Sequence, residues 1–330
     1  MANDNLRQLL AGRPIHVLYG GFSNERPVSL VSGEAVAAAL KDAGHRVVRV
    51  DVDKSFGSEG SEILAGTGLA FIVLHGEFGE DGEIQEILEG WGIPYTGSGP
   101  QASHRAMDKA LAKKAFAKRG VPTPRWEGAP RSANPDELVK RYGLPLVIKP
   151  SASGSSIGVT IVREAAQIPG ALAEAGRHSG VPLVEEFVPG RELTVGVLGS
   201  KALPAVELRP TKQFYDYEAK YADDAGTEYI CPAPVDAAVA AAAQSHALTA
   251  HRALGCRHFS RVDLRMSPEG ALHVLEVNTI PGFTSHSLLP KAAAAAGLDF
   301  TALVERIAEM ALMDARKQST ATVGENGHGS

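Results

Sequence analysis

The order of apolar runs in the first hundred residues limits the fold of this chain more than any other feature. Strands are predicted for residues 14–19, 46–52 and 70–74, and helices for residues 28–43 and 83–89. Gly20 follows the first strand, and Gly44 and Gly90 close the two helices. This alternation of strand and helix predicts a small parallel sheet over residues 1 to about 105.

The rest of the chain mixes strands and helices without this regular alternation. A basic helix is predicted for residues 106–119, ended by a Gly-Val-Pro-Thr-Pro segment. Further strands are predicted at 146–149, 158–162, 182–187, 192–198, 258–266 and 271–277, and further helices at 236–254, 290–296 and 301–317. The fold class is therefore α/β and α+β, and 330 residues suffice for two or three lobes that share a cleft. Residues 318–330 are rich in Gly, Ser, Thr and Asn and are predicted to be a disordered tail.

The composition argues against several classes of protein. A net charge of -5 gives no long-range attraction for nucleic acid or an anionic membrane. The two cysteines, Cys231 and Cys256, have no metal-ligand spacing and cannot form a disulfide framework. The N-terminal residues lack the order of a signal peptide, and no apolar run reaches the roughly 18 residues of a membrane helix. We therefore expect a cytoplasmic protein without nucleic-acid or membrane partners.

Two predicted strands near the C-terminal end carry alternating polar residues. Arg261 and Asp263 share one face of the first strand, and Glu276 and Asn278 share one face of the second. If residues 267–270 form the turn of a hairpin, these side chains converge, and their oxygens suit magnesium. Arg261 then lies where a developing negative charge needs stabilisation. The alternative is a solvated polar face with ordinary cross-strand ion pairs.

Two loops have the composition of ligand-binding segments. Residues 150–158 are rich in Gly and Ser and follow Lys149, which favours a loop that covers phosphate; the alternative is a plain turn. The loop is not a Walker loop, because it joins two strands and lacks that motif. Residues 20–26 lie where a strand ends and a helix begins, so backbone amides there favour an anion and Glu25 favours an ammonium group. An amino acid carries both charges, although Glu25 or Asn24 could instead only cap the helix.

Taken together, these segments resemble the D-alanine:D-alanine ligases, an ATP-grasp family that makes the dipeptide precursor of bacterial peptidoglycan. The resemblance covers about residues 14–315 and rests on motifs at 20–26, 74–82, 107–109, 149–156, 185–192, 214–221 and 278–287. It implies an ATP-grasp fold made of an N-terminal Rossmann-like parallel-sheet domain at 1–105, a central ATP-grasp lobe at 106–190, and a C-terminal ATP-grasp lobe at 191–317 with the metal and substrate site. One departure is Pro27, where the family usually has an acidic residue; proline suits a first helical turn.

The resemblance also implies a role for each residue that matches a family motif. The residues expected to bind ATP are Lys109, Lys149, Ser155, Ser156, Glu185, Glu186, Val188, Glu192, Phe214 and Lys220. Those expected to bind two Mg²⁺ ions, with Mn²⁺ as a substitute, are Asp263, Glu276 and Asn278. Those expected to act in catalysis are Glu25, Ser155, Tyr221, Arg261 and Gly282. Those expected to hold the two D-alanine substrates are Glu25, His75, Arg261, Gly282, Ser287 and Leu288.

The activity that the resemblance implies is the ATP-dependent ligation of two D-alanine molecules, through an acyl phosphate of the first, for peptidoglycan synthesis. Phosphoryl transfer depends mainly on positioning and on cations that stabilise oxygen charge, which matches the residue types of the candidate site. The family further implies a homodimer. Two alternatives stay open: a sibling ligase that uses D-lactate as its second substrate, and an ATP-binding regulator without turnover.

Overall fold

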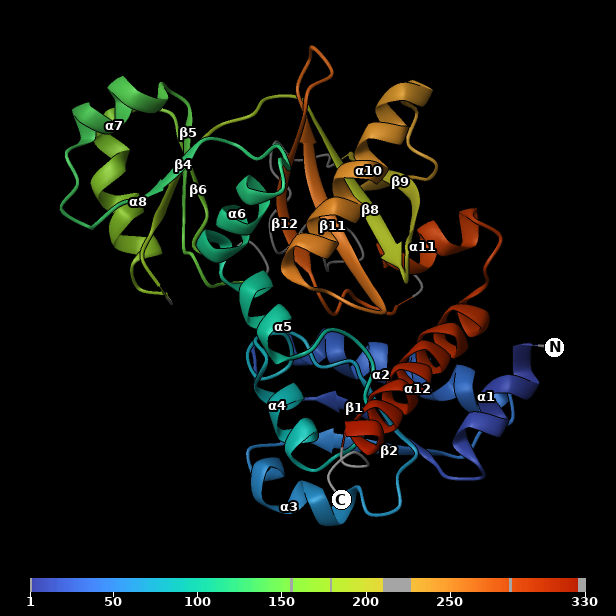
Figure 1. The fold of residues 1–330 in the computed structure, drawn as a ribbon. Coiled ribbons are helices and arrows are strands. Elements are labelled where there is room, and N and C mark those ends of the chain that lie inside the picture. The colour runs from blue at the N-terminus through green and yellow to red at the C-terminus, as the bar shows by residue number, and fades with distance from the viewer. Residues whose placement is uncertain (1, 155–156, 179, 210–226, 285–286, 326–330) are drawn as a thin grey trace.

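The computed structural model describes residues 2–154, 157–178, 180–209, 227–284 and 287–325 of the chain (Figure 1). Its strands form three sheets, with the orders β2-β1-β3, β4-β7-β5-β6 and β10-β9-β8-β11-β12. The strands are β1 (Ile15–Gly20), β2 (Val47–Val52), β3 (Leu69–Ile72), β4 (Trp126–Gly128), β5 (Leu146–Lys149), β6 (Thr160–Val162), β7 (Leu183–Glu186), β8 (Arg191–Leu198), β9 (Lys201–Arg209), β10 (Glu228–Ile230), β11 (Phe259–Met266) and β12 (Leu272–Asn278). The helices are α1 (Ala2–Leu10), α2 (Arg26–Asp42), α3 (Phe56–Ile63), α4 (Glu83–Gly90), α5 (Pro100–Met107), α6 (Lys109–Lys118), α7 (Pro135–Tyr142), α8 (Ile168–Ala175), α10 (Ala237–Leu254), α11 (Leu288–Ala295) and α12 (Phe300–Glu325), with a 3-10 turn at Ala165–Gln167.

The first sheet is parallel, as the sequence predicts, with β1 between β2 and β3. All four residues of β3 are buried, which is typical of a parallel sheet with both faces covered. Helix α2 packs closely on β1 because Gly33 has no side chain: a Cβ atom there would lie 2.4 Å from the Cβ atom of Tyr19. Pro27 lies in the first turn of α2, and Glu25 is the residue before the helix. The sheet and α2 together therefore place residues 20–26 at the end of the central strand.

The other two sheets are antiparallel and confirm the mixed fold class. Helices α7 and α8 lie beside the second sheet, and α10 lies along the third (Figure 1). Alternate residues Val262, Leu264 and Met266 of β11 are buried in the core that the third sheet forms with α10. Arg261 and Asp263 are half-buried on the opposite face of β11. The polar face of this strand is therefore left to the candidate site.

The helix predicted for residues 106–119 is confirmed as α6, but it begins at Lys109, because residues 106 and 107 belong to the end of a separate helix, α5. Asp108 separates the two helices with an extended backbone, φ -84° and ψ 103°. Its carboxylate accepts hydrogen bonds from the backbone N–H groups of Ala110 (2.8 Å) and Leu111 (3.0 Å). An aspartate that caps a new helix satisfies amides that otherwise have no partner. Lys109 consequently begins α6 and does not lie within a continuous helix.

Two helices pack outside the lobe in which their sequence position would put them. Phe116 of α6 belongs to the core of the third sheet, with Leu193 and Val262. Leu303 and Ile307 of α12 belong to the core of the first sheet, with Ile15 among others. The predicted divisions after residues 105, 190 and 317 remain predictions. One hydrophobic core contains residues of both the first and the last predicted lobe. A second core contains residues of both the central and the last predicted lobe.

Helix α12 is also longer than predicted. It continues to Glu325, past residue 317, where the sequence predicts its end, and the disordered tail remains a prediction. A helix that is already formed extends at little cost through residues of moderate helix propensity. Residues 326–330 lie outside the described residues. Within the described ranges, no helix is both long and apolar enough to cross a membrane.

Candidate active site

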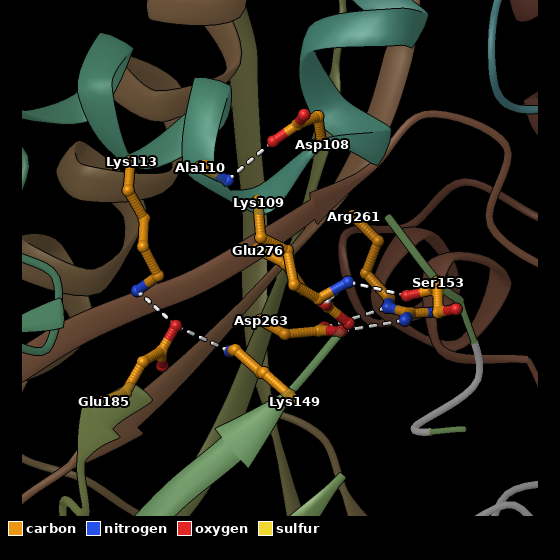
Figure 2. A network of polar contacts seen from close by, with 10 residues as sticks. All are labelled: Asp108, Lys109, Ala110, Lys113, Lys149, Ser153, Glu185, Arg261, Asp263 and Glu276. Atoms are coloured by element: carbon orange, nitrogen blue, oxygen red, sulfur yellow. Dashed lines mark hydrogen bonds and ion pairs between the residues drawn. The ribbon is translucent and has the colours of Figure 1, made fainter. Parts of the chain in front are cut away.

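The two polar strands form the predicted hairpin. In the antiparallel pair β11 and β12, Asp263 lies opposite Glu276 and Arg261 opposite Asn278. Arg261 donates two hydrogen bonds to the Asp263 carboxylate, at 2.9 and 2.8 Å (Figure 2). Thr194 of the neighbouring β8 donates a third at 2.6 Å. Side chains from two adjacent strands, β11 and β8, therefore hold this carboxylate, which is a structural basis for a site with defined geometry.

Lys109 brings the start of α6 to the same point. Its ammonium Nζ lies 3.1 Å from Oε2 of Glu276 and donates to the carbonyl oxygen of Ser153 at 2.7 Å (Figure 2). The backbone N–H of Lys109 in turn donates to the carbonyl oxygen of Ser151 at 2.8 Å. The cap at Asp108 thus allows one lysine to join β12 to the Gly/Ser loop that follows β5.

A second charged cluster lies beside the first and contains a residue that the sequence did not single out. Oε1 of Glu185 on β7 forms ion pairs with two lysines (Figure 2). It lies 3.0 Å from Nζ of Lys149 on β5 and 3.2 Å from Nζ of Lys113 on α6. Burial would raise the pKa of Glu185, but the charges of Lys149 and Lys113 outweigh it and lower that pKa. Burial lowers the pKa of Lys113 to about 8, against the opposing charge of Glu185. The side chain of Lys113 is fully buried, and only its pairing with a residue distant in sequence indicates a role.

The segment from β7 to β8 holds the other residues predicted to meet the nucleotide. Glu186 pairs with Arg125. Arg265 of β11 donates to the carbonyl oxygen of Val188 at 3.2 Å and lies 3.5 Å from Oε2 of Glu192. Arg265 therefore ties the connection between two sheets to the strand that carries Asp263.

Glu25 and His75 meet at the end of the first sheet. His75 donates from Nδ1 to the carbonyl oxygen of Ile280 at 2.9 Å, and burial lowers its pKa while the nearby Glu25 opposes this. Glu25 is 8% exposed and lies beside two glycines. A Cβ atom on Gly76 or Gly154 would lie 2.8 or 3.3 Å from its Oε2. The loops after β3 and β5 thus both approach one carboxylate oxygen of Glu25.

Glu80, another residue that the sequence analysis did not propose for the site, lies near Glu25. It accepts the backbone N–H of Gly76 at 2.8 Å. Burial raises the pKa of Glu80 well above its usual value, and the charge of Glu25 raises it further. Burial therefore favours the neutral form of the Glu80 carboxyl group.

The loop after β12 carries the last group of predicted residues. Asn278 accepts the backbone N–H of Ile280 at 2.9 Å. Ser287 accepts the backbone N–H of Thr284 at 2.9 Å, and a Cβ atom on Gly282 would lie 2.8 Å from Ser287 Oγ. Leu288 is buried at the start of α11. Gly282 and Ser287 consequently lie together, as their assignment to one substrate site requires.

Comparisons with known proteins decide the family. Residues 116–309 match the model of the D-ala D-ala ligase C-terminus, and residues 54–98 match that of the N-terminus. The chain is 46% identical over 307 residues to a D-alanine–D-alanine ligase of Anaeromyxobacter sp. strain Fw109-5, covering 92% of this chain and 98% of the relative.

The chain belongs to the D-alanine–D-alanine ligase family.

Other relatives of the D-alanine–D-alanine ligase family agree with this. A ligase from Citrifermentans bemidjiense is 47% identical over 302 residues, covering 92% of this chain and 97% of the relative. A crystal structure of the Bacillus anthracis ligase complexed with ATP has a TM-score of 0.81 at 31% identity, covering 93% of this chain and 99% of that one. The structure of VanG D-Ala:D-Ser ligase from Enterococcus faecalis has a TM-score of 0.79 at 32% identity, covering 91% and 99%.

Not all residues that the family resemblance selected can be located. Those outside the described residues are Ser155, Ser156, Phe214, Lys220 and Tyr221. The remaining ones fall into three groups of neighbours: Arg261, Asp263, Glu276, Asn278 and Lys109; Lys149 and Glu185 with the segment 186–192; and Glu25 and His75 with the loop 278–288. Their assigned roles stay predictions.

Proposed function

We propose that this chain uses ATP to join two D-alanine molecules into D-alanyl-D-alanine for peptidoglycan synthesis. The observation that carries this proposal is that Asp263 and Glu276, which lie opposite each other on adjacent strands, are each paired with a cation. Asp263 pairs with Arg261, and Glu276 pairs with Lys109 of α6. A charged cluster of this kind suits phosphoryl transfer to a carboxylate, because negative charge gathers on oxygen in that reaction. The similarity to a family member whose structure was solved with ATP supports the choice of nucleotide.

The donor set fits magnesium as the metal. Asp263 and Glu276 offer carboxylate oxygens and Asn278 an amide oxygen, all hard donors on one hairpin. No cluster of three or more His, Cys, Asp or Glu side chains suited to a metal occurs in the described ranges. Asp263, Glu276 and Asn278 would hold two Mg²⁺ ions, for which Mn²⁺ can substitute. When bound, these ions neutralise phosphate charge.

The chain's own residues would bind the ATP phosphates and the first D-alanine. Lys109 and Lys149 would bind the phosphates, with Ser155, Ser156 and Lys220 as further predicted contacts. Glu25 would receive the ammonium group of the first D-alanine, whose carboxylate takes the γ-phosphoryl group of ATP.

In the second half of the reaction, Ser287 and Leu288 would hold the second D-alanine. Its amine attacks the acyl phosphate and phosphate leaves. Arg261 and the Gly282 amide would stabilise the oxyanion that forms in between. Ser155 and Tyr221 are predicted to link to Glu25 over the substrates, which would exclude water.

The test is a phosphate-release assay with ATP, Mg²⁺ and D-alanine, with the dipeptide identified by mass spectrometry. We expect D-alanine to stimulate phosphate release, with one dipeptide formed for each phosphate. D-Serine and D-lactate are added as alternative second substrates, because the similar VanG protein is named a D-Ala:D-Ser ligase. No stimulation by D-alanine would contradict the proposal, and preferred use of D-lactate or D-serine would identify a sibling ligase.

The proposal also includes a homodimer that works in the cytoplasm, and the family resemblance supports the dimer. Light scattering at micromolar protein should give a mass near twice 34.7 kDa. A monomeric mass that persists at higher concentration would contradict the dimer.

A further inference from the structure

Lys113 is a buried cation that the proposed chemistry does not use. It lies in α6, its side chain is 0% exposed, and it donates to Thr123 Oγ1 at 2.6 Å. Its other partner is Glu185 Oε1 at 3.2 Å. Burying a lysine is costly unless it is paired, so the pairing with Glu185 is what makes this position tenable.

Glu185 is paired with a second cation at the same oxygen. Lys149 lies 3.0 Å from Oε1, and Figure 2 shows both ammonium groups approaching this atom. The side chain of Glu185 is 3% exposed, so the three groups form a buried cluster with two positive charges and one negative charge. The surplus positive charge favours an anion close by.

The two lysines differ in their freedom to meet that anion. The side chain of Lys113 is fully buried, and its ammonium group is held by the hydroxyl group of Thr123. Lys149 is the last residue of β5, 8% exposed, and the Gly/Ser loop follows it at once. Lys149 is therefore the one that can turn from Glu185 to a phosphate while Lys113 stays.

We propose that Lys113 is a positioning residue, the permanent counter-ion of Glu185, which releases Lys149 from Glu185 when the ATP phosphates bind. This inference rests on the proposed function, since it takes ATP as the ligand. Without Lys113, every movement of Lys149 toward phosphate would leave a buried carboxylate without a cation, which proteins tolerate poorly. The free protein would keep its Lys149–Glu185 pair, so the loss would appear on binding phosphate and not on folding.

The measurement is the ratio of the dissociation constants of adenosine and ATP, by calorimetry on the full chain with Mg²⁺. This ratio isolates what the phosphates add to binding and cancels changes in adenine contacts. In Lys113→Met we expect ATP binding to weaken at least about 100-fold, as for loss of one partner in a buried ion pair. Adenosine affinity should change less than about twofold, and kcat at saturating ATP less than about threefold. Lys114→Met, an exposed lysine at the next position of α6, is the matched control and should match the unmodified protein.

A double-mutant cycle separates this role from general packing. Glu185→Gln removes the buried charge that retains Lys149, so adding Lys113→Met to it should change the ratio less than about threefold. Any of three results would overturn the proposal. The ratio could be unchanged in Lys113→Met, adenosine and ATP could lose affinity equally, or the full loss of ATP affinity could persist in the double variant. If Lys113→Met does not fold, Lys113→Gln, which removes the charge but keeps a polar side chain beside Thr123, is measured in its place, with the same loss of ATP binding expected and an unchanged ratio overturning the proposal. Because binding is measured without D-alanine, failure of the ligase assay leaves this test intact.

Discussion

Two regions of the molecule pair buried nitrogen-bearing side chains with carboxylates, and the two pairings differ in number. In the candidate site, Lys113 and Lys149 share the carboxylate of Glu185, so cations are in excess. Two histidines contact helix α12: His45 Nε2 lies 2.7 Å from Oε1 of Glu305, and His258 Nε2 lies 3.1 Å from Oδ2 of Asp314. Each imidazole therefore has one carboxylate partner of its own. A surplus cation can turn to an incoming anion, whereas a matched pair that loses one member leaves a buried group unpaired. The first arrangement therefore suits ligand binding, and the second holds α12 in place.

The largest effect should come from the candidate site. Glu276→Gln removes a carboxylate charge that faces both Lys109 and the proposed metal, so we expect kcat to fall at least about 100-fold. The thermal midpoint should move by no more than about 2 °C, because the side chain is only 70% buried and keeps its shape. Phosphate release and calorimetry measure the two quantities. Glu228→Gln, an exposed glutamate on β10, is the control, and near-normal activity in Glu276→Gln would contradict the metal assignment.

The opposite pattern is expected beneath α12. Glu305→Leu leaves the buried Nε2 of His45 without its partner, so the free energy of unfolding should fall by about 1–3 kcal/mol. Turnover at saturating substrates should stay the same. Urea unfolding and the phosphate assay measure both, with the exposed Lys317→Met on the same helix as control. A loss of turnover without a loss of stability would break the contrast between the two regions.

The pH dependence of stability sharpens the contrast further. The backbone N–H of Gly97 donates to Nδ1 of His258, which therefore lacks a proton, and burial followed by the charge of Arg257 lowers the His258 pKa to about 4, against Asp314. A lowered folded-state pKa gives stability that is complete above about pH 6.5, the usual pKa of an unfolded histidine, and is lost as the pH falls toward 4.

We expect His258→Asn to flatten this loss by up to about 1 kcal/mol per pH unit between pH 6 and 5. Asparagine tolerates the positive φ of 61° at this position. Urea unfolding at pH 7, 6 and 5 compares the two proteins. Burial also lowers the pKa of His251 to about 4, but His251 is present in both, so the difference reports His258. Parallel curves would disprove the assignment.

The smallest effect should come from the hydroxyl that supports Lys113. Thr123→Val removes the acceptor of the 2.6 Å hydrogen bond but leaves Lys113 beside Glu185. We expect ATP binding to weaken only about two- to tenfold, as for a single hydrogen bond, and less than in Lys113→Met. Calorimetry with ATP measures it. A larger loss than in Lys113→Met would show that Thr123, and not the counter-ion, governs this cluster.

The part of the site that follows a short sequence period was predictable. Alternation alone places Arg261 with Asp263, and Glu276 with Asn278, because strand side chains repeat every second residue. The register shift between Asp263 and Leu264 was not predictable. The shift is a β-bulge at Leu275, which is half-buried while Val274 and Val277 are buried. A bulge depends on how two strands pair, and the sequence of one strand does not show this.

Residues whose role depends on distant partners were missed. Lys113 reads as a surface lysine of a basic helix, and its burial follows only from Glu185, 72 positions later. The pair His45 and Glu305 is 260 positions apart and has no local pattern. The break at Asp108 could have been predicted, because aspartate before a run of helix formers is a signal for a helix start.

The packing of α12 on the first sheet has a consequence for how this chain is made. Leu6, Ile15 and Val17 near the N-terminus share one core with Leu303 and Ile307. A ribosome adds residues from the N-terminal end, so the first sheet emerges long before the helix that covers it. Its apolar face gains its full cover only when the last part of the chain is released, and until then it is open to chaperones or to misassembly.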